Sequence, residues 1–545
     1  MTTTVVHRVI DSNKQTESKS NGWAYAEDIP GSRCGPDDGP WPRPYERLQD
    51  DDIWRELRYL AKPQTVQFDE THGWRADSLN FQPSPNTRTQ DRYVVKQLKI
   101  NGRLWSLTGV FDGHLGDVTV DHVSYHLPII IGEFLQKAFD NEPLRLTDPS
   151  FISQSFSDSI IAFDDAIAGD VLDLFGGLEG LKEYSDEQIR HVINDHHQGG
   201  HNWRKARLNM YGTTALVALV DPDHDNLWVA NLGDCQAVLV SPKGLIDWDV
   251  ELLTTDHNGN NDAEIERVRR QHPDEPECVI DRRVLGALAP FRCLGDTPFK
   301  QPPEFTRRIL YNLLPGFPDK SPWEEFLARN HTPPYISTQP EVTHVSLRNV
   351  SPDSRTAPRF LILASDGFTD LCTNEGRNKI ITDWVHDIVE TSPHLCMPVH
   401  NDKGNINAIL PMSPTNSKSF GFSPSRSSFS GPPSFILSPL SPTPSVSSPP
   451  VSASNSTATT SSESSSSTST TATSSTYATT PGSSCSDSSF PNPSARLPGH
   501  PSHNMALRLL RRALGGDDKE SVSKCLTLDM DVAWLDDTAI VVQTL

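Results

Sequence analysis

The chain has few cysteines, an excess of acidic residues and no long apolar run, and each feature excludes a class of protein. Its eight cysteines stand singly in 545 residues, without the spacing of a zinc finger or the density of a disulfide framework. The formal net charge of −22 disfavours binding to nucleic acid, which needs a basic surface. No stretch of 18 apolar residues occurs, so we expect no membrane span.

The first residues show no targeting segment. Residues 1–8 lack the apolar core of a secretory signal, and the arginine-poor stretch that follows soon contains Asp11 and Glu17. Secretion is therefore not expected, and a mitochondrial presequence is not evident. Together with the unpaired cysteines, this start predicts an intracellular protein in a reducing compartment.

Composition divides the chain into an arm, a domain and an insertion. Residues 1–60 are mostly polar and predict a largely disordered arm. Residues 61–545 predict one folded domain, with an early hairpin at Asn101-Gly102. Residues 412–501 are dominated by Ser, Thr and Pro and cannot bury enough apolar area to offset the entropy of ordering. Because patterned segments follow them, we interpret them as a disordered insertion in the domain.

Three short apolar stretches each border an aspartate beside a turn residue. They span residues 109–114, 360–367 and 536–542. Asp-Gly after a strand is common turn chemistry, which is the simplest interpretation of any one of them. Three carboxylates from distant parts of the chain could also converge on divalent cations, which prefer oxygen ligands.

Motifs around these aspartates resemble, in order, those of the metal-dependent (type 2C) protein phosphatases. Seven elements match: Phe-Asp-Gly-His at 111–114, Gly-Thr-Thr-Ala at 212–215, Val-Ala-Asn-Leu-Gly-Asp at 229–234, Leu-Thr-Thr-Asp-His at 253–257, Leu-Gly-Asp at 294–296, Ala-Ser-Asp-Gly at 364–367 and Asp-Asp at 536–537. Further stretches, among them 283–292, 333–336 and 510–516, are similar to the pyruvate dehydrogenase phosphatase branch of that family.

The resemblance implies an α+β fold, a four-layer αββα sandwich of two antiparallel sheets flanked by helices, with a binuclear metal site at the sheet edge. It implies a protein serine/threonine phosphatase that hydrolyses its phosphoprotein substrate with a metal-activated water. The cofactors would be two Mg²⁺ or Mn²⁺ ions, with a possible third labile ion. The narrower branch suggests pyruvate dehydrogenase as substrate and the mitochondrial matrix as compartment, whereas the missing presequence favours the cytoplasm.

The resemblance also assigns roles to single residues. Asp112 would bridge two metals, and Asp234 and Asp370 would lie near the labile ion. The full set of implied ligands is Asp112, the carbonyl of Gly113, Asp366, Asp536, Asp234, Asp370, Gln90 and Asp91. Which of Asp536 and its neighbour Asp537 binds metal stays open at this point.

His114 occupies the position of a proposed general acid. An imidazolium there could protonate the departing serine or threonine oxygen, and a pKa near neutrality suits that role. The alternative is a histidine that only supports the metal ligands through hydrogen bonds.

Two positions depart from the family pattern. Gln90 replaces a glutamate, which keeps a carbonyl ligand but removes a negative charge. Asn86 stands where the family has an arginine that grips phosphate, and Arg88 lies nearby, so both are candidates for contact with the substrate phosphate.

Other functions remain open from the sequence. A pseudophosphatase, with the fold but no turnover, is the main alternative, and Gln90 is its only motivation. A hydrolase of small phosphoesters is also conceivable. The Ser-Pro and Thr-Pro pairs of the insertion suit proline-directed kinases, so a kinase or adaptor could bind there. Four histidines between 191 and 201 suggest zinc only weakly, because their surroundings are polar and contain no cysteine.

Overall fold

The computed structural model describes residues 21–69, 72–84, 87–145, 148–244, 247–317, 320–348, 358–392 and 503–545. The insertion predicted at 412–501 and the candidate residue Asn86 lie outside these ranges. Within them, none of the helices combines the length and the apolar character that crossing a membrane requires.

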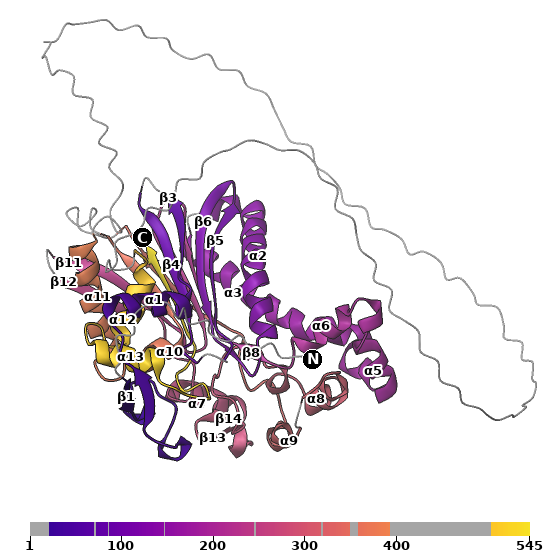
Figure 1. The fold of residues 1–545 in the computed structure, drawn as a ribbon. Coiled ribbons are helices and arrows are strands. Elements are labelled where there is room, and N and C mark those ends of the chain that lie inside the picture. Colours follow the sequence, from indigo (N-terminus) through magenta and orange to yellow (C-terminus); the bar gives the residue numbers. More distant parts are fainter. Residues whose placement is uncertain are drawn as a thin grey trace, which may run out of the picture. The chain divides into compact units, whose positions relative to one another are not determined.

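Two antiparallel sheets pack face to face at the centre of the fold (Figure 1). One has five strands in the order β16-β10-β9-β6-β5, and the other has six in the order β12-β11-β17-β18-β4-β3. The first sheet consists of β5 (Arg92–Ile100), β6 (Arg103–Phe111), β9 (Ala215–Val220), β10 (Asn226–Leu232) and β16 (Glu341–Ser346). The second consists of β3 (Gln64–Asp69), β4 (Trp74–Phe81), β11 (Gln236–Lys243), β12 (Asp247–Leu252), β17 (Phe360–Ala364) and β18 (Thr538–Thr544).

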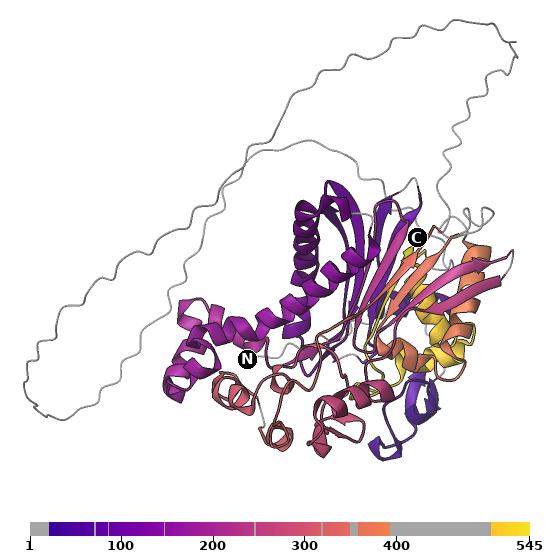
Figure 2. The ribbon, with the colours of Figure 1, turned by 180° about the vertical axis from the view of Figure 1, so that it is seen from behind.

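Helices cover the outer face of each sheet (Figures 1 and 2). On the five-stranded sheet lie α2 (Val118–Asn141) and α3 (Pro149–Leu172). On the six-stranded sheet lie α1 (Asp50–Ala61), α11 (Arg377–Thr391), α12 (Met505–Ala513) and α13 (Lys519–Thr527). The layers are helix, sheet, sheet and helix, so the predicted αββα sandwich is confirmed.

Alternating side chains explain why both sheets are buried on two faces. In β6, Val110 points between the sheets, where it joins Leu216, Val229 and Leu361, whereas its neighbour Phe111 packs under the helices of the five-stranded sheet. Because successive residues of a strand face opposite sides, continuous apolar strands suit a sheet covered on both faces.

Shorter elements gather at one end of the sandwich. A small sheet joins β7 (Gly113–His114), β8 (Gly212–Thr213) and β15 (Leu294–Gly295). Beyond it the chain forms β13 (Val279–Ile280), β14 (Arg283–Val284), α4 (Gly177–Leu181), α5 (Asp186–Ile193), α6 (His201–Arg207), α7 (Asp262–Gln271), α8 (Pro303–Arg308) and α9 (Ser321–Leu327), and α10 (Asp366–Leu371) directly follows β17.

Residues 21–60 are folded, so the predicted disordered arm is wrong for this stretch. β1 (Asn21–Ala24) pairs with β2 (Arg43–Glu46), and α1 follows. The apolar side chains of Ile29, Tyr45 and Ile53 are buried in the same core as α12 and α13. These contacts join segments almost 500 residues apart, so local composition could not reveal them.

Candidate metal and phosphate site

The register of the five-stranded sheet brings several predicted ligands to one edge. β6 ends at Phe111 opposite Arg92, the first residue of β5. The segment that precedes Arg92 and the one that follows Phe111 therefore leave the sheet together, which places Gln90 and Asp91 beside Asp112. β9 begins at the same edge, since Leu216 pairs with Val110.

The six-stranded sheet presents its ligands at the same end. β17 ends at Ala364, which pairs both with Gln236 at the start of β11 and with Ile540 near the start of β18. Asp366 and Asp536 therefore flank this edge. The turn that carries Asp234 runs directly from β10 of one sheet to β11 of the other, so the two edges meet there.

The mutual repulsion of these carboxylates indicates that they lie within electrostatic reach of one another. Burial raises the pKa of Asp112 well above its ordinary value, and the charges of Asp366, Asp91 and Asp234 raise it further. Burial, followed by the charges of Asp234 and Asp370, likewise raises the pKa of Asp366. Buried like charges in one place favour either protonation or the addition of cations. The cluster is therefore suited to hold positive charge.

The donors at this edge fit hard divalent cations. The side-chain oxygen Oε1 of Gln90 is buried and has no hydrogen-bond partner in the described residues. A side chain at Gly113 would collide with the backbone oxygen of Gln90 and with Val120, so only glycine lets these segments meet so closely. Across the described ranges, no three His, Cys, Asp or Glu side chains enclose a common metal position as they stand. The donor chemistry nevertheless matches Mg²⁺ or Mn²⁺, which prefer carboxylate and carbonyl oxygens.

Hydrogen bonds distinguish the two adjacent aspartates. Both oxygens of Asp537 are engaged, one by the side-chain amide of Gln82 at 2.8 Å and the other by the backbone N–H of Gln90 at 2.5 Å. Asp536 instead receives the Asp537 backbone N–H at 3.0 Å and an ion pair from Arg33. Asp537 therefore holds the loop of Gln90, and Asp536 remains the better candidate ligand.

Asp91 has a structural task as well as its predicted role. Its Oδ2 accepts the backbone N–H of Ala539 at 2.9 Å, and the hydroxyl of Ser365 accepts the same N–H at 2.9 Å. Burial raises the pKa of Asp91, the charges of Asp537 and Asp366 raise it further, and its hydrogen bonds oppose the shift. Asp91 thus links the start of β5 to β18, and its role as a metal ligand stays a prediction.

His114 is held by an aspartate to which sequence reasoning gave no role. Its Nε2 lies 2.6 Å from Oδ2 of Asp296, which also accepts the thiol of Cys293 at 3.0 Å. Burial disfavours the imidazolium, but the charge and hydrogen bond of Asp296 outweigh it and raise the pKa of His114. Gly212 permits this pair, because a side chain there would overlap Asp296. The sequence signal for Asp296 was its place in the Leu-Gly-Asp motif at 294–296.

The structure gives Arg88 partners away from the carboxylate cluster. Its guanidinium lies 2.6 Å from Asp117 and 3.7 Å from Asp121, at the start of α2. Arg92 pairs with the same Asp121 at 2.7 Å. The side chain of Arg88 is 73% exposed, so neither burial nor a contact directs it toward the predicted ligands.

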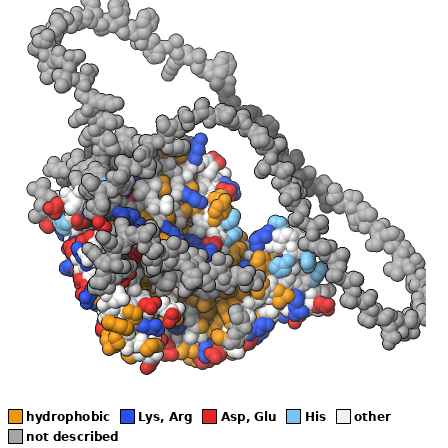
Figure 3. All heavy atoms as spheres, in the orientation of Figure 1, with side chains coloured by type: hydrophobic (Ala, Val, Ile, Leu, Met, Phe, Trp, Pro, Cys, Tyr) orange, Lys and Arg blue, Asp and Glu red, His pale blue; other side chains and the backbone are white. Residues whose placement is uncertain are grey.

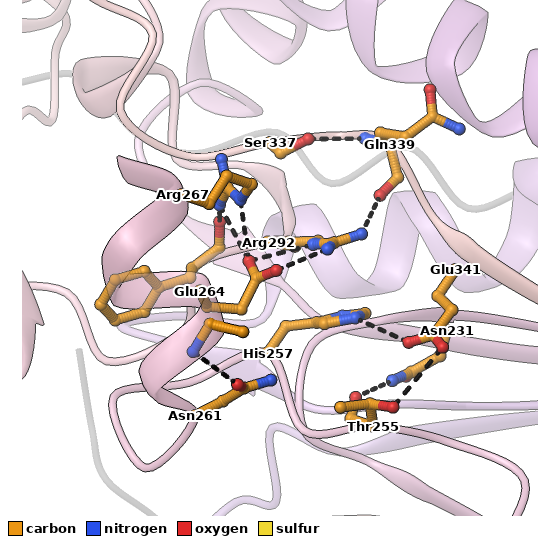
Figure 4. Close-up of polar contacts among 12 residues, drawn as sticks. Asn231, Thr255, His257, Asn261, Glu264, Arg267, Arg292, Ser337, Gln339 and Glu341 are labelled. Atoms are coloured by element: carbon orange, nitrogen blue, oxygen red, sulfur yellow. Dashed lines mark hydrogen bonds and ion pairs between the residues drawn. The ribbon is translucent and has the colours of Figure 1, made fainter. Parts of the chain in front are cut away.

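A separate polar network fixes the turn that carries Asp234. Asn258 donates to Asp234 Oδ2 at 3.0 Å, and Nδ1 of His257 accepts the backbone N–H of Gly233 at 3.2 Å. The other ring nitrogen of His257 points to Glu341 at 3.3 Å (Figure 4). Burial and the charge of Arg292 lower the pKa of His257, so the imidazole is neutral at pH 7 and supports the turn through hydrogen bonds.

Glu264 anchors the same network on α7. Its carboxylate receives two donors of Arg267, at 2.9 and 3.1 Å, and the guanidinium of Arg292 (Figure 4). Arg292 also donates to the backbone oxygen of Gln339 at 3.0 Å. Burial alone would raise the pKa of Glu264, but these arginines lower it to about 2. The network joins α7 to the segment that leads into β16.

Two of the histidines near α5 and α6 form hydrogen bonds with neighbouring groups. Figure 3 shows histidine side chains gathered on that side of the molecule. His196 bonds the backbone oxygen of Leu314 at 3.1 Å, and His201 accepts from Arg204 at 3.2 Å. No metal-binding group that includes them occurs in the ranges that the structure covers.

Comparison with known proteins assigns the chain to a protein family. The family model described as protein phosphatase 2C matches residues 66–399, which is more than half of the chain. The chain therefore belongs to the protein phosphatase 2C family.

Individual relatives are more specific but are matched only in part. The chain is 38% identical over 183 residues to the human mitochondrial pyruvate dehydrogenase (acetyl-transferring) phosphatase 2, covering 32% of each protein. It is 25% identical over 291 residues to the mitochondrial phosphatase 1 of the same name from Saccharomyces cerevisiae, covering 52% of this chain and 45% of that one. It is also 27% identical over 356 residues to a protein phosphatase 2C homolog of Schizosaccharomyces pombe, covering 65% and 72%. The matches thus span about a third to a half of the pyruvate dehydrogenase phosphatases.

Proposed function

We propose that the chain is a metal-dependent protein phosphatase that hydrolyses phosphoserine and phosphothreonine. The observation that carries this proposal is the set of buried carboxylates that the two sheets bring to one edge, with the His114–Asp296 pair beside them. Membership of the protein phosphatase 2C family supports the same class of reaction.

The oxygen donors at the edge would hold the ions. We assign Asp112, the carbonyl of Gly113, Asp366 and Asp536 to the main site, and Gln90 with Asp91 to its second ion. Asp234 and Asp370 would serve a labile third ion. When bound, two Mg²⁺ or Mn²⁺ ions would neutralise the phosphoryl oxygens and activate the attacking water.

His114 would protonate the leaving oxygen. Asp296 engages Nε2 and favours the imidazolium, which leaves Nδ1 available as the donor. A proton delivered as the P–O bond breaks avoids release of an unstable alkoxide, and a positioned general acid accelerates such a step about 10²–10⁴-fold.

The relatives motivate the proposed substrate and compartment. We propose phosphorylated pyruvate dehydrogenase as the substrate and the mitochondrial matrix as the location, because the matched phosphatases of that name are mitochondrial. This part depends on similarity over a minority of each relative's length.

The test is turnover of a phosphothreonine peptide and of phosphorylated pyruvate dehydrogenase, each with Mn²⁺, Mg²⁺ or EDTA. We expect metal-dependent release of phosphate that Asp112→Asn abolishes, since an amide cannot bridge two cations as a carboxylate does. Asp223→Asn is the matched control, because Asp223 pairs with Arg103 on the surface. A folded wild-type protein that binds the phosphopeptide without turnover would instead support the pseudophosphatase alternative.

A further inference from the structure

Arg33 brings a guanidinium to the carboxylate edge from outside the region that matches the family model. It lies in the folded N-terminal segment, and the matched region begins at residue 66. Its Nη2 forms an ion pair with Asp536. Its positive charge also acts on Asp112, Asp366 and Asp370, opposing the increase of their pKa values by burial. Arg33 therefore contacts one predicted metal ligand, Asp536, and its charge reaches three others.

The backbone around Arg33 is fixed against the same loops that carry the ligands. The Arg33 N–H donates to the carbonyl of Trp534 at 2.8 Å, and Ser32 forms an antiparallel bridge with Leu535. Gly31 adopts a positive φ of 78°, and a side chain there would crowd the backbone of Asp370 and Leu371. A segment attached at these points presents its arginine in a defined place rather than as a mobile surface cation.

The guanidinium of Arg33 is also partly exposed to solvent. Its side chain is 54% exposed, and it borders a hollow of about 350 Å³ lined by Asp28, Pro30, Ser32, Asp370 and Thr373. The ion pair with Asp536 is its only side-chain hydrogen bond to the residues that the structure describes. A guanidinium has five N–H donors in a planar fork, so donors remain for a second anion while Asp536 orients the group.

Neither of the two positions first considered for phosphate binding supplies such a donor. Asn86 replaces the arginine that the family places against phosphate, and an amide carries no charge to offset the phosphoryl oxygens. Arg88, the other candidate, pairs with Asp117 and Asp121 instead. Planar bidentate recognition of phosphate is a task for which arginine is especially suited.

We infer that Arg33 supplies the guanidinium that binds the phosphoryl oxygens of the substrate, in place of the arginine missing at position 86. This inference rests on the proposed phosphatase function. The folded N-terminal segment then forms part of the substrate site, with Asp536 orienting the arginine and the hollow admitting the polypeptide beside the phosphorylated residue.

The first test is the affinity of the Mn²⁺-loaded protein for inorganic phosphate, measured by calorimetry. We expect Arg33→Ala to weaken phosphate binding at least about 10-fold. Arg33→Lys should recover only part of the affinity, because its ammonium group keeps the charge but lacks the planar, bidentate donors of a guanidinium. The KM for a phosphothreonine peptide should rise in parallel. Arg43→Ala is the matched control: Arg43 lies in the same segment and faces Asp531 at 3.5 Å, and its loss should leave phosphate affinity unchanged.

The half-saturating Mn²⁺ concentration distinguishes phosphate binding by Arg33 from competition between Arg33 and the metal for Asp536. A variant Arg33→Ala that binds phosphate as well as wild type, whether or not it binds Mn²⁺ more tightly, would overturn the inference; tighter Mn²⁺ binding would show a cation that merely competes for Asp536. Circular dichroism of Arg33→Ala and Arg33→Lys checks that both fold. If the wild-type protein shows no turnover with either metal, the proposed function fails, and phosphate calorimetry still decides the role of Arg33.

Discussion

At the scale of single residues, His114 offers the clearest test of the chemistry. We expect His114→Ala to lower kcat on a phosphopeptide by about 10² or more, because the alkoxide leaving group needs a proton. The loss should be much smaller for p-nitrophenyl phosphate, whose leaving group needs little protonation. Steady-state kinetics on both substrates is the measurement, and equal losses would mean that His114 is structural. Asp296→Asn should show the same dependence on leaving group in weaker form.

Gln90 allows a second test at this scale. Its buried Oε1 has no hydrogen-bond partner in the described part of the chain, and it stands where a glutamate would add a charge. Gln90→Glu should therefore lower the half-saturating Mn²⁺ concentration, since a carboxylate attracts a cation more strongly than an amide does. Metal titration of activity and of thermal stability would both report the change. An unchanged or higher value in both would place Gln90 away from the ions.

At the scale of elements, the Glu264 network predicts how stability depends on pH. The folded-state pKa of about 2 lies below the ordinary 4.5, so the stabilisation is complete above about pH 4.5 and is lost as the pH falls toward 2. Glu264→Gln should reduce the free energy of unfolding at pH 7 by about 3 kcal/mol, from the size of that pKa difference. Urea unfolding at pH 7, 5 and 4 should show this deficit narrow at the lowest pH. Glu266→Gln, on the exposed face of the same helix, is the control. A deficit equally large at pH 4 would contradict the assignment.

Some secondary-structure elements and contacts could be predicted from the sequence, and others could not. The hairpin at Asn101-Gly102 is confirmed as β5 and β6, because a turn signal and apolar strands are local. The sandwich is confirmed because the family motifs carry it. The packing of residues 21–60 and the approach of Arg33 to Asp536 could not be predicted, since each depends on a partner roughly 500 residues away. Asp296 could have been identified from its motif, but only coordinates show its bond to His114.

At the scale of the whole molecule, the ends of the long segment between α11 and α12 meet. Arg508 donates to the hydroxyl of Ser392 at 2.8 Å, and the indole of Trp384 donates to the Met505 carbonyl at 3.1 Å. A short Gly/Ser linker in place of residues 413–500 should therefore close without strain. The shorter loop should stabilise the fold by about 1 kcal/mol, because closure entropy grows with the logarithm of length. The melting temperature should therefore rise slightly and kcat/KM should be retained, whereas a failure to fold would show that the segment belongs to the domain.

The position of β18 has a consequence for synthesis. This strand lies inside the six-stranded sheet, between β17 and β4, although it comes from residues 538–544. A ribosome that has translated β4 and β17 has still not supplied the strand that separates them, nor Asp536 just before it. The nascent chain must therefore keep two incomplete sheet edges apart while the whole of the Ser/Thr/Pro-rich segment is translated. Exposed edges of this kind are where chaperones bind and where misassembly begins.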